Sequence, residues 1–351
     1  KSVDGNDSIA NTSVISHAGK IYAIVEAGGY PVEIDQELNS LNTKPFYGDE
    51  NRGFTAHPKL DPNTGELHAM CYDYANKFET IDYVVIDKNG SHKKTQTIPF
   101  ETRSMLHECA ITENYVLVLD LSVTFSLERL GGGYFPFAWD DNHQSRIGLL
   151  NRNDESQDVQ WFEIDRTYFF HTFNAYEDKN GDVVVSATAY DRLFDKDRNG
   201  PFTESSPHLT RWILDLKSRR AKSEQLDDRS IEFPRIHPDL VSKSNQFGYA
   251  LASSNSKKPD FKEIVKYDFV NDSSEVYEYG SGNFGAEPVF VPSEGANDED
   301  EGYLLSLVYD QETDKSDLII LNAQEVSSGP IAKVHLPQRV PFGFHGDWIN
   351  I

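Results

Sequence analysis

Residues 61–90 read DPNTGELHAMCYDYANKFETIDYVVIDKNG, and the pattern in this stretch decides the fold. Two runs rich in β-branched and aromatic residues, Leu67–Tyr72 and Tyr83–Ile86, are bounded by clusters of Asp, Asn, Thr and Gly. Such clusters favour tight turns, because Gly adopts positive φ and Asp or Asn side chains bond to the nearby backbone. The stretch therefore predicts short strands joined by hairpins.

The same pattern continues in both directions along the chain. Further runs of this kind are Ile21–Val25, Tyr115–Leu121, Val183–Ala187, Trp212–Leu216, Ile264–Phe269, Tyr303–Tyr309 and Leu318–Leu321. No segment has a long apolar stripe of helical period, so long helices are not expected. About 20 or more strands would overfill one sandwich, whereas a propeller uses four strands per blade around a central channel. We therefore expect an all-β protein, and a propeller fits the number of strands.

Composition and charge restrict the kinds of partner. The chain has 351 residues, 38% of them hydrophobic, which is enough to bury a core. Its 33 basic and 57 acidic residues give a net charge of −24, which repels phosphate backbones, so no nucleic-acid partner is expected. The acidic stretches Asp191–Asn199 and Asn297–Glu301 are predicted to be solvated loops.

Cysteine usage and the start of the chain bear on the compartment. The two cysteines, Cys71 and Cys109, lie in apolar strand-like runs and do not suggest a disulfide framework. We find no apolar run of about 18 residues and no basic-then-apolar leader, so a cytoplasmic protein is expected. Residues 1–8 are polar and lack an initiator Met, from which we expect that an N-terminal segment is missing from this sequence.

Eleven histidines fall into two groups. Seven lie in turns or at polar strand positions, where a surface or singly hydrogen-bonded ring is expected: His17, His68, His92, His143, His208, His237 and His335. Four others stand beside apolar or aromatic residues at the edges of strand-like runs: His57, His107, His171 and His345.

The four histidines of the second group are candidates for metal ligands. Burying an imidazole is unfavourable unless both ring nitrogens find partners, and a divalent metal on one nitrogen with an acceptor on the other meets this need. Their separations of 50, 64 and 174 residues differ from the closely paired ligands of zinc fingers. In a propeller, however, one ligand per blade can point at the same axis. The residues alone leave a metal site and four unrelated core histidines as open interpretations.

Four phrases in the chain resemble the iron-ligand motifs of the carotenoid cleavage oxygenase family, in the family's order. They are FTAHPKLDP (54–62), HECAITENY (107–115), HTFNAYE (171–177) and FHG (344–346). The resemblance extends from about Asn11 to Trp348 and does not cover the family's opening segment.

This resemblance implies a fold and a metal centre. The implied fold is a seven-bladed β-propeller with the metal on its central axis and loops forming a cap over it. Residues 1–351 would form one catalytic domain that lacks the family's N-terminal segment. The resemblance also implies that the four histidines hold Fe(2+), and that Glu26, Glu232 and Glu287 accept hydrogen bonds from the far nitrogens of three of them, with His57 lacking a glutamate.

The implied activity is that of a non-haem iron(II) dioxygenase. It would cleave a conjugated C=C bond of a carotenoid or apocarotenoid with O2 into two carbonyl products, without a nicotinamide or flavin. Its partners would be an apolar conjugated small molecule and O2, with peripheral membrane contact during substrate uptake as an option. Candidate tunnel residues, for which plain core packing is the alternative, are Tyr134, Phe135, Phe137, Trp139, Phe170, Phe173 and Phe342.

Three alternatives remain at this point: a stilbene-cleaving dioxygenase, a non-redox isomerase as in one branch of the family, and a non-catalytic metal-binding propeller. One departure bears on the first of them. Stilbene-cleaving members carry a lysine directly before the first of the three glutamates, where it engages a phenolic oxygen. Here that position is Val25, which cannot donate a hydrogen bond, so a polyene is favoured over a hydroxystilbene.

Overall fold

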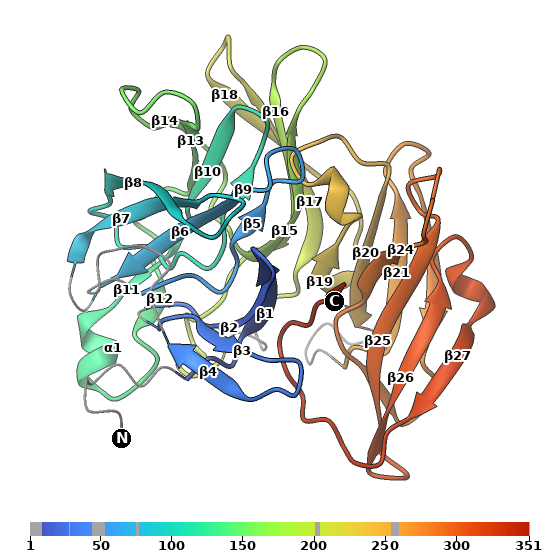
Figure 1. Ribbon diagram of the computed structural model, residues 1–351. Coiled ribbons are helices and arrows are strands. Elements are labelled where there is room, and N and C mark those ends of the chain that lie inside the picture. The colour runs from blue at the N-terminus through green and yellow to red at the C-terminus, as the bar shows by residue number, and fades with distance from the viewer. Residues whose placement is uncertain are drawn as a thin grey trace.

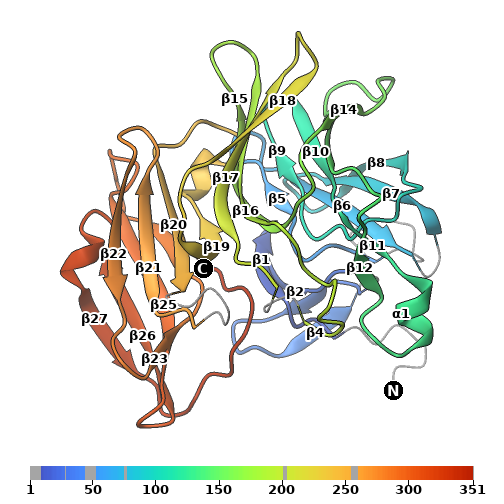
Figure 2. The same ribbon diagram turned by 180° about the vertical axis from the view of Figure 1, so that it is seen from behind.

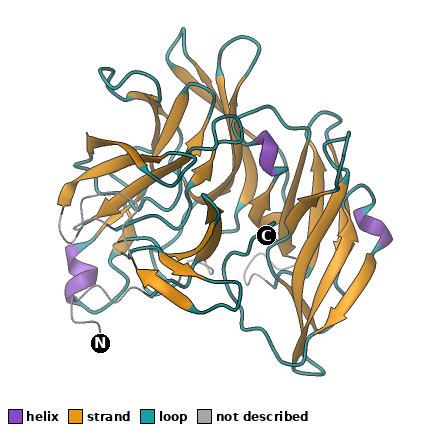
Figure 3. Cartoon of the chain, in the orientation of Figure 1, coloured by secondary structure: helices purple, strands orange, loops and turns teal. Residues whose placement is uncertain are grey.

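The computed structural model describes residues 9–27, 29–43, 53–74, 77–200, 204–253 and 260–350. The eight opening residues, on which the expectation of a missing N-terminal segment rests, lie outside the described part. Strands dominate, and the few helices are short (Figure 3).

Six large antiparallel sheets are arranged around a common centre (Figures 1 and 2). The first consists of β1 (Ser13–His17), β2 (Lys20–Ile24), β3 (Val32–Ile34) and β4 (Ser40–Thr43). The second consists of β5 (Lys59–Leu60), β6 (Leu67–Asp73), β7 (Lys77–Ile86) and β8 (His92–Pro99). The third consists of β9 (Ala110–Ile111), β10 (Tyr115–Asp120), β13 (Arg146–Asn151) and β14 (Gln160–Glu163).

The other three sheets follow in chain order. The fourth consists of β15 (Tyr168–Glu177), β16 (Val183–Tyr190), β17 (His208–Asp215) and β18 (Arg220–Gln225). The fifth consists of β19 (Ser230–Arg235), β20 (Phe247–Ser253), β21 (Glu263–Asp268) and β22 (Ser273–Glu278), with the 3-10 helix η1 (Pro238–Leu240). The sixth consists of β23 (Asn283–Gly285), β24 (Val289–Pro292), β25 (Gly302–Asp310), β26 (Lys315–Asn322) and β27 (Pro330–His335), with the 3-10 helix η2 (Val326–Ser328).

A small excursion interrupts the third sheet between β10 and β13. It contains β11 (Val123–Phe125), the helix α1 (Leu127–Gly131) and β12 (Phe137–Trp139), and its two strands pair with each other. Ser126 caps the helix, because its hydroxyl accepts a hydrogen bond from the Arg129 backbone N–H. No described helix is long and apolar enough to cross a membrane.

The all-β propeller expected from the strand pattern is confirmed, but the expected seven blades are wrong. The described residues form six blades, five of four strands and one of five. Strand-rich sequence does not set the blade number by itself, because a hairpin such as β11–β12 adds two strands without building a blade. The number seven came from the family resemblance, and the cap over a metal stays a prediction.

Burial within a blade follows from how blades pack. All eight residues of β16 are buried, since its strand lies within a blade and is covered on both faces by neighbouring blades. The outermost strand β27 is exposed along its whole length. The inner strands β1, β5, β15 and β19 lie near the centre in both views, and the C-terminal segment returns there (Figures 1 and 2). This return brings the backbone N–H of His345 within 3.2 Å of the Thr12 carbonyl oxygen, beside the first blade.

Candidate metal centre

The four candidate histidines converge from four separate parts of the propeller. His57 lies two residues before β5, His107 lies three residues before β9, and His171 lies in β15, where the pairing with β16 shifts register. His345 comes from the segment after β27, which contains no strand. One ligand atom from each ring lies within 4.8 Å of the other three. The structure thus brings together side chains that are up to 288 residues apart in the sequence, since His345 follows His57 by that number (345 − 57 = 288).

Three glutamates occupy the outer nitrogens of three of these rings. His107 Nδ1 lies 3.1 Å from Glu26 Oε2, and His171 Nδ1 lies 2.7 Å from Glu232 Oε2. His345 Nδ1 lies 3.0 Å from Glu287 Oε1. A carboxylate on Nδ1 fixes the orientation of the ring and leaves Nε2 free to bind a cation.

His57 is held differently from the other three. Its backbone N–H donates to Thr55 Oγ1 at 3.2 Å, and no described carboxylate contacts its ring. Its Nε2 is buried and has no hydrogen-bond partner. An unpartnered buried nitrogen costs free energy, and a cation at this point would remove that cost.

Two of the other three inner nitrogens also fit a cation. His107 Nε2 and His171 Nε2 lie 3.3 Å apart. Two nitrogens that each lie about 2.1 Å from one ion can be at most about 4.2 Å apart, and the observed separation is within this limit. Burial, followed by the neighbouring histidines, holds the pKa values of His57 and His171 well below the ordinary value, so both rings stay neutral and able to bind metal. The donor set therefore fits a divalent cation, and four imidazole ligands would add no negative charge to its ligand shell.

Glu232 and Glu287 have further surroundings that change the pKa values of their carboxyl groups. Burial raises the pKa of Glu232 to about 7, although its carboxylate accepts from Tyr190 Oη at 3.1 Å and from the Phe233 N–H at 2.8 Å. Burial also opposes ionisation of Glu287, but Arg235, with Nε 2.9 Å from Oε1, and His345 together hold the pKa of Glu287 at about 2. Arg235 also donates to the Gly346 carbonyl oxygen, so this pair holds the C-terminal segment at the centre.

The aromatic candidates divide by their distance from the histidines. The Phe170 ring centroid lies 5.0 Å from that of His107 and 6.3 Å from that of Phe194. Phe194 in turn stacks at 4.8 Å on Phe135, which lies 5.6 Å from Phe137 and is 36% exposed. A continuous row of aromatic rings thus leads from the surface near α1 to the histidine cluster.

The remaining four candidates lie off this row. The Tyr134 ring is exposed below the Arg198 guanidinium, and Trp139 donates its indole N–H to Asp141. Phe173 packs into the next blade, against Tyr267 and Phe269. Phe342 is 63% exposed and contacts Phe284 and Tyr309.

Sequence reasoning missed two aromatic residues near the site. Phe233 lies 5.5 Å from His171 and 5.4 Å from His345, between ring centroids, and has a positive φ of 55°. Its position directly after Glu232 was the available signal. Phe194 lies in the stretch Asp191–Asn199, so the expectation of a wholly solvated loop is wrong: the apolar side chains of Leu193 and Phe194 turn inward and are buried.

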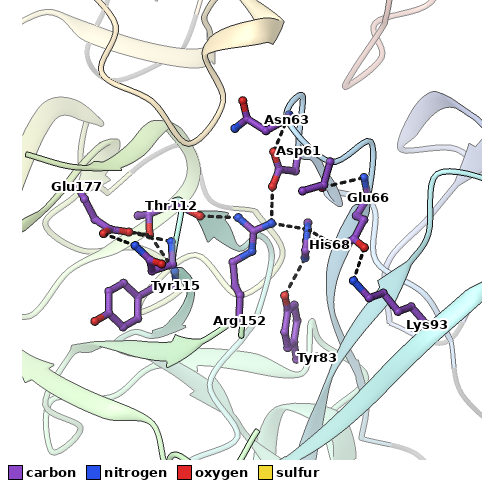
Figure 4. A network of polar contacts seen from close by, with 12 residues as sticks. Asp61, Asn63, Glu66, His68, Tyr83, Lys93, Thr112, Tyr115, Arg152 and Glu177 are labelled. Carbon is purple, nitrogen blue, oxygen red and sulfur yellow. Dashed lines mark hydrogen bonds and ion pairs between the residues drawn. The ribbon is translucent and has the colours of Figure 1, made fainter. Parts of the chain in front are cut away.

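His68 also departs from expectation, because it is 2% exposed and bonded on both nitrogens. Its Nε2 accepts from Arg152 at 2.7 Å, and its Nδ1 lies 2.7 Å from Tyr83 Oη (Figure 4). Arg152 also binds Asp61 and the Thr112 carbonyl oxygen. This network borders a cavity of about 630 Å³. Both nitrogens of this ring are thus bonded to other side chains.

Comparisons with known proteins identify the family of the chain. The family model described as retinal pigment epithelial membrane protein matches residues 2–350. A carotenoid cleavage oxygenase from Mycobacterium tuberculosis is 36% identical over 389 residues, covering 96% of this chain and 76% of that protein.

Solved structures indicate the same family. The lignostilbene dioxygenase of Pseudomonas brassicacearum is 30% identical with a TM-score of 0.88, covering 98% of this chain and 76% of that chain. A cobalt-substituted apocarotenoid oxygenase from Synechocystis is 25% identical with a TM-score of 0.87, covering 98% and 75%. The chain therefore belongs to the carotenoid cleavage oxygenase family, that of the retinal pigment epithelial membrane protein, and is an oxidoreductase of the dioxygenase type.

Proposed function

We propose that this protein is a non-haem iron(II) dioxygenase that cleaves a conjugated C=C bond of a carotenoid or apocarotenoid. The observation that carries the proposal is the cluster of His57, His107, His171 and His345, with the unpartnered Nε2 of His57 inside it. When bound, iron(II) supplies the one-electron chemistry that lets dioxygen react with a closed-shell alkene. The overall reaction turns R–CH=CH–R′ and O2 into two aldehydes, so it needs no further reductant.

The protein groups have separate tasks in this proposal. The four imidazoles hold the ion, and Glu26, Glu232 and Glu287 keep three of the rings oriented with Nε2 inward. Phe170 beside His107 and Phe233 beside His171 and His345 offer apolar faces against which a polyene can pack, and they exclude water from the reacting bond.

The substrate is proposed to be a polyene because the site offers no phenol anchor at Val25. A hydroxystilbene would lose a hydrogen bond to a charged group there, worth about 1.5–3 kcal/mol. The M. tuberculosis relative is named for carotenoid cleavage, and the Pseudomonas relative for lignostilbene. A stilbene-cleaving dioxygenase is therefore the second candidate, supported by that likeness.

An apolar surface near α1 supports a peripheral lipid contact for substrate uptake. Leu127 is 70% exposed, Leu130 53%, Tyr134 40% and Phe135 36%. Phe135 also begins the aromatic row that leads to His107. We propose that an apolar substrate enters from a lipid surface on this side of the protein.

The deciding experiment is product mass analysis after aerobic incubation of iron-loaded protein with a carotenoid, an apocarotenal and a 4-hydroxystilbene. With ¹⁸O2, both carbonyl products of the polyene should carry label when exchange with water is trapped by rapid reduction. His171→Ala is the inactive control. Cleavage of the stilbene alone would favour the second candidate. Isomerised substrate without oxygen uptake would reject the dioxygenase, and iron-loaded protein that turns over none of the three would favour a non-catalytic scaffold.

A further inference from the structure

A buried ion pair lies next to the histidine cluster. Lys59 Nζ is 2.8 Å from Glu108 Oε1, and the Glu108 side chain is only 3% exposed. The same carboxylate oxygen accepts the Thr172 backbone N–H at 2.9 Å and also the Thr172 hydroxyl. We call these three residues the brace.

Each member of the brace is next to a candidate ligand in the sequence. Lys59 follows His57 by two residues, and Glu108 directly follows His107. Thr172 directly follows His171. One carboxylate therefore joins the three segments that carry three of the four histidines.

The backbone does not make this connection by itself. Lys59 belongs to β5 and Thr172 to β15, and Glu108 lies two residues before β9, so the three segments belong to three different sheets. Strand hydrogen bonds fix distances within a blade, whereas the distance between blades depends on side chains. His57 has particular need of such a tie, because no described glutamate holds its ring.

The charge of Glu108 explains why Lys59 and Thr172 are both drawn to it. A buried carboxylate without a cation is strongly destabilising, so Glu108 draws the Lys59 ammonium and with it the segment of His57. Its hydrogen bond from the Thr172 N–H is charge-assisted and therefore stronger than a neutral one. Such contacts transmit a fixed spacing to the adjacent backbone.

We infer that Lys59, Glu108 and Thr172 are positioning residues that hold the segments of His57, His107 and His171 at the spacing one metal ion requires. This inference rests on the metal centre of the proposed function. None of the three touches the reacting bond in this role; they act through the ligands. Metal affinity and ligand geometry should therefore both depend on the brace.

The test uses Co²⁺ as a probe, because its visible absorption spectrum reports coordination geometry without turnover. Co²⁺ affinity and spectrum are measured for the metal-free wild type and for Glu108→Gln, which keeps an acceptor for Thr172 but removes the charge that binds Lys59. We expect Co²⁺ binding to weaken by about 10–100-fold, with an altered spectrum. Thr172→Ser and Thr172→Val change the brace less than Glu108→Gln does. Serine keeps the hydroxyl bond to Glu108, so Thr172→Ser should retain wild-type affinity. Valine lacks the hydroxyl, so Thr172→Val should weaken Co²⁺ binding several-fold.

A second buried ion pair provides the matched control. Lys266 Nζ lies 2.6 Å from Asp300 Oδ2, with side chains only 7% and 12% exposed, and this pair contacts none of the four histidines. We expect Lys266→Met to lower the unfolding temperature, as we expect for the brace variants, but to leave the affinity and spectrum of bound Co²⁺ unchanged. This separates positioning of the ligands from general stability.

The outcomes distinguish the two proposals. If the wild type binds Co²⁺ but Glu108→Gln and Thr172→Val bind it as tightly and with the same spectrum, the brace is only structural and the inference is overturned. If the wild type binds no Co²⁺, the metal centre fails and the inference fails with it. If Glu108→Gln does not fold, the comparison of Thr172→Val with Thr172→Ser decides.

Discussion

Replacing His68 by Gln should remove an acid-sensitive contribution to stability. Burial, followed by the neighbouring Arg152, lowers the pKa of His68 in the folded protein from 6.5 to about 3. Burial disfavours the charged ring, and Nε2 must in addition stay unprotonated to accept from Arg152, a contact drawn in Figure 4. Protons therefore bind the unfolded chain first, and the stability due to this depressed pKa is complete above pH 6.5 and lost as the pH falls toward 3.

The size of this effect follows from the pKa difference. Below pH 6.5 each unit costs about 1.4 kcal/mol, so the loss between pH 7 and pH 5 is about 2 kcal/mol. The side chain is buried, so solvent screening does not reduce this figure much.

The assay is the free energy of unfolding from urea titrations of metal-free protein at pH 7, 6 and 5. Wild type and His68→Gln share all other titrating groups, so only their difference is read. That difference should shift by about 2 kcal/mol in favour of the variant between pH 7 and pH 5. His335→Gln, at a ring that is 80% exposed, controls for loss of a histidine at the surface. Parallel curves for wild type and His68→Gln would refute the reasoning.

Three further predictions concern the site and its surroundings. Glu232→Gln removes the carboxylate from His171 Nδ1 and should weaken iron retention by about 10–100-fold. The measurement is the iron content after dialysis against a chelator, and an unchanged content would contradict the role given to Glu232. Val25→Lys should raise the ratio of kcat/KM for a 4-hydroxystilbene over an apocarotenal by about tenfold or more, because it supplies a charged hydrogen-bond donor; an unchanged ratio would show that this position does not select substrate. Leu127→Ser with Leu130→Ser should reduce binding to lipid vesicles in a sedimentation assay, since both side chains are exposed apolar groups, while equal sedimentation would remove α1 from the contact.

Much of the fold could be predicted because its signals are local. Strand runs such as Leu67–Tyr72 and the turns beside them are set by neighbouring residues, and the structure has β6 at Leu67–Asp73. The blade number could not be predicted in this way, since whether two strands build a blade or a side hairpin depends on what they pack against. The strands β11 and β12 pair with each other and with no other described strand, and Thr124 of β11 forms only an isolated bridge with Ser104.

The candidate site was visible in the sequence only where motifs marked it. His57, His107, His171 and His345 stand in recognisable phrases, whereas Phe194 lies in a run of charged residues without such a mark. The buried His68 ring is bonded to Arg152, which lies 84 residues away in the sequence. The residues next to His68 therefore do not reveal this partner. The sequence therefore predicts which residues are candidates better than it predicts which neighbours surround them.

The position of His345 has a consequence for the order of events during synthesis. Its segment follows every strand of the six blades and crosses back to the first blade, where its backbone bonds to Thr12. A nascent chain will therefore have released His57, His107 and His171 from the ribosome well before the fourth imidazole emerges. Until then only three of the four nitrogens are available, so the proposed metal site is incomplete until the last described blade has been translated. In the proposed function, incorporation of the ion would therefore follow translation of all the described blades.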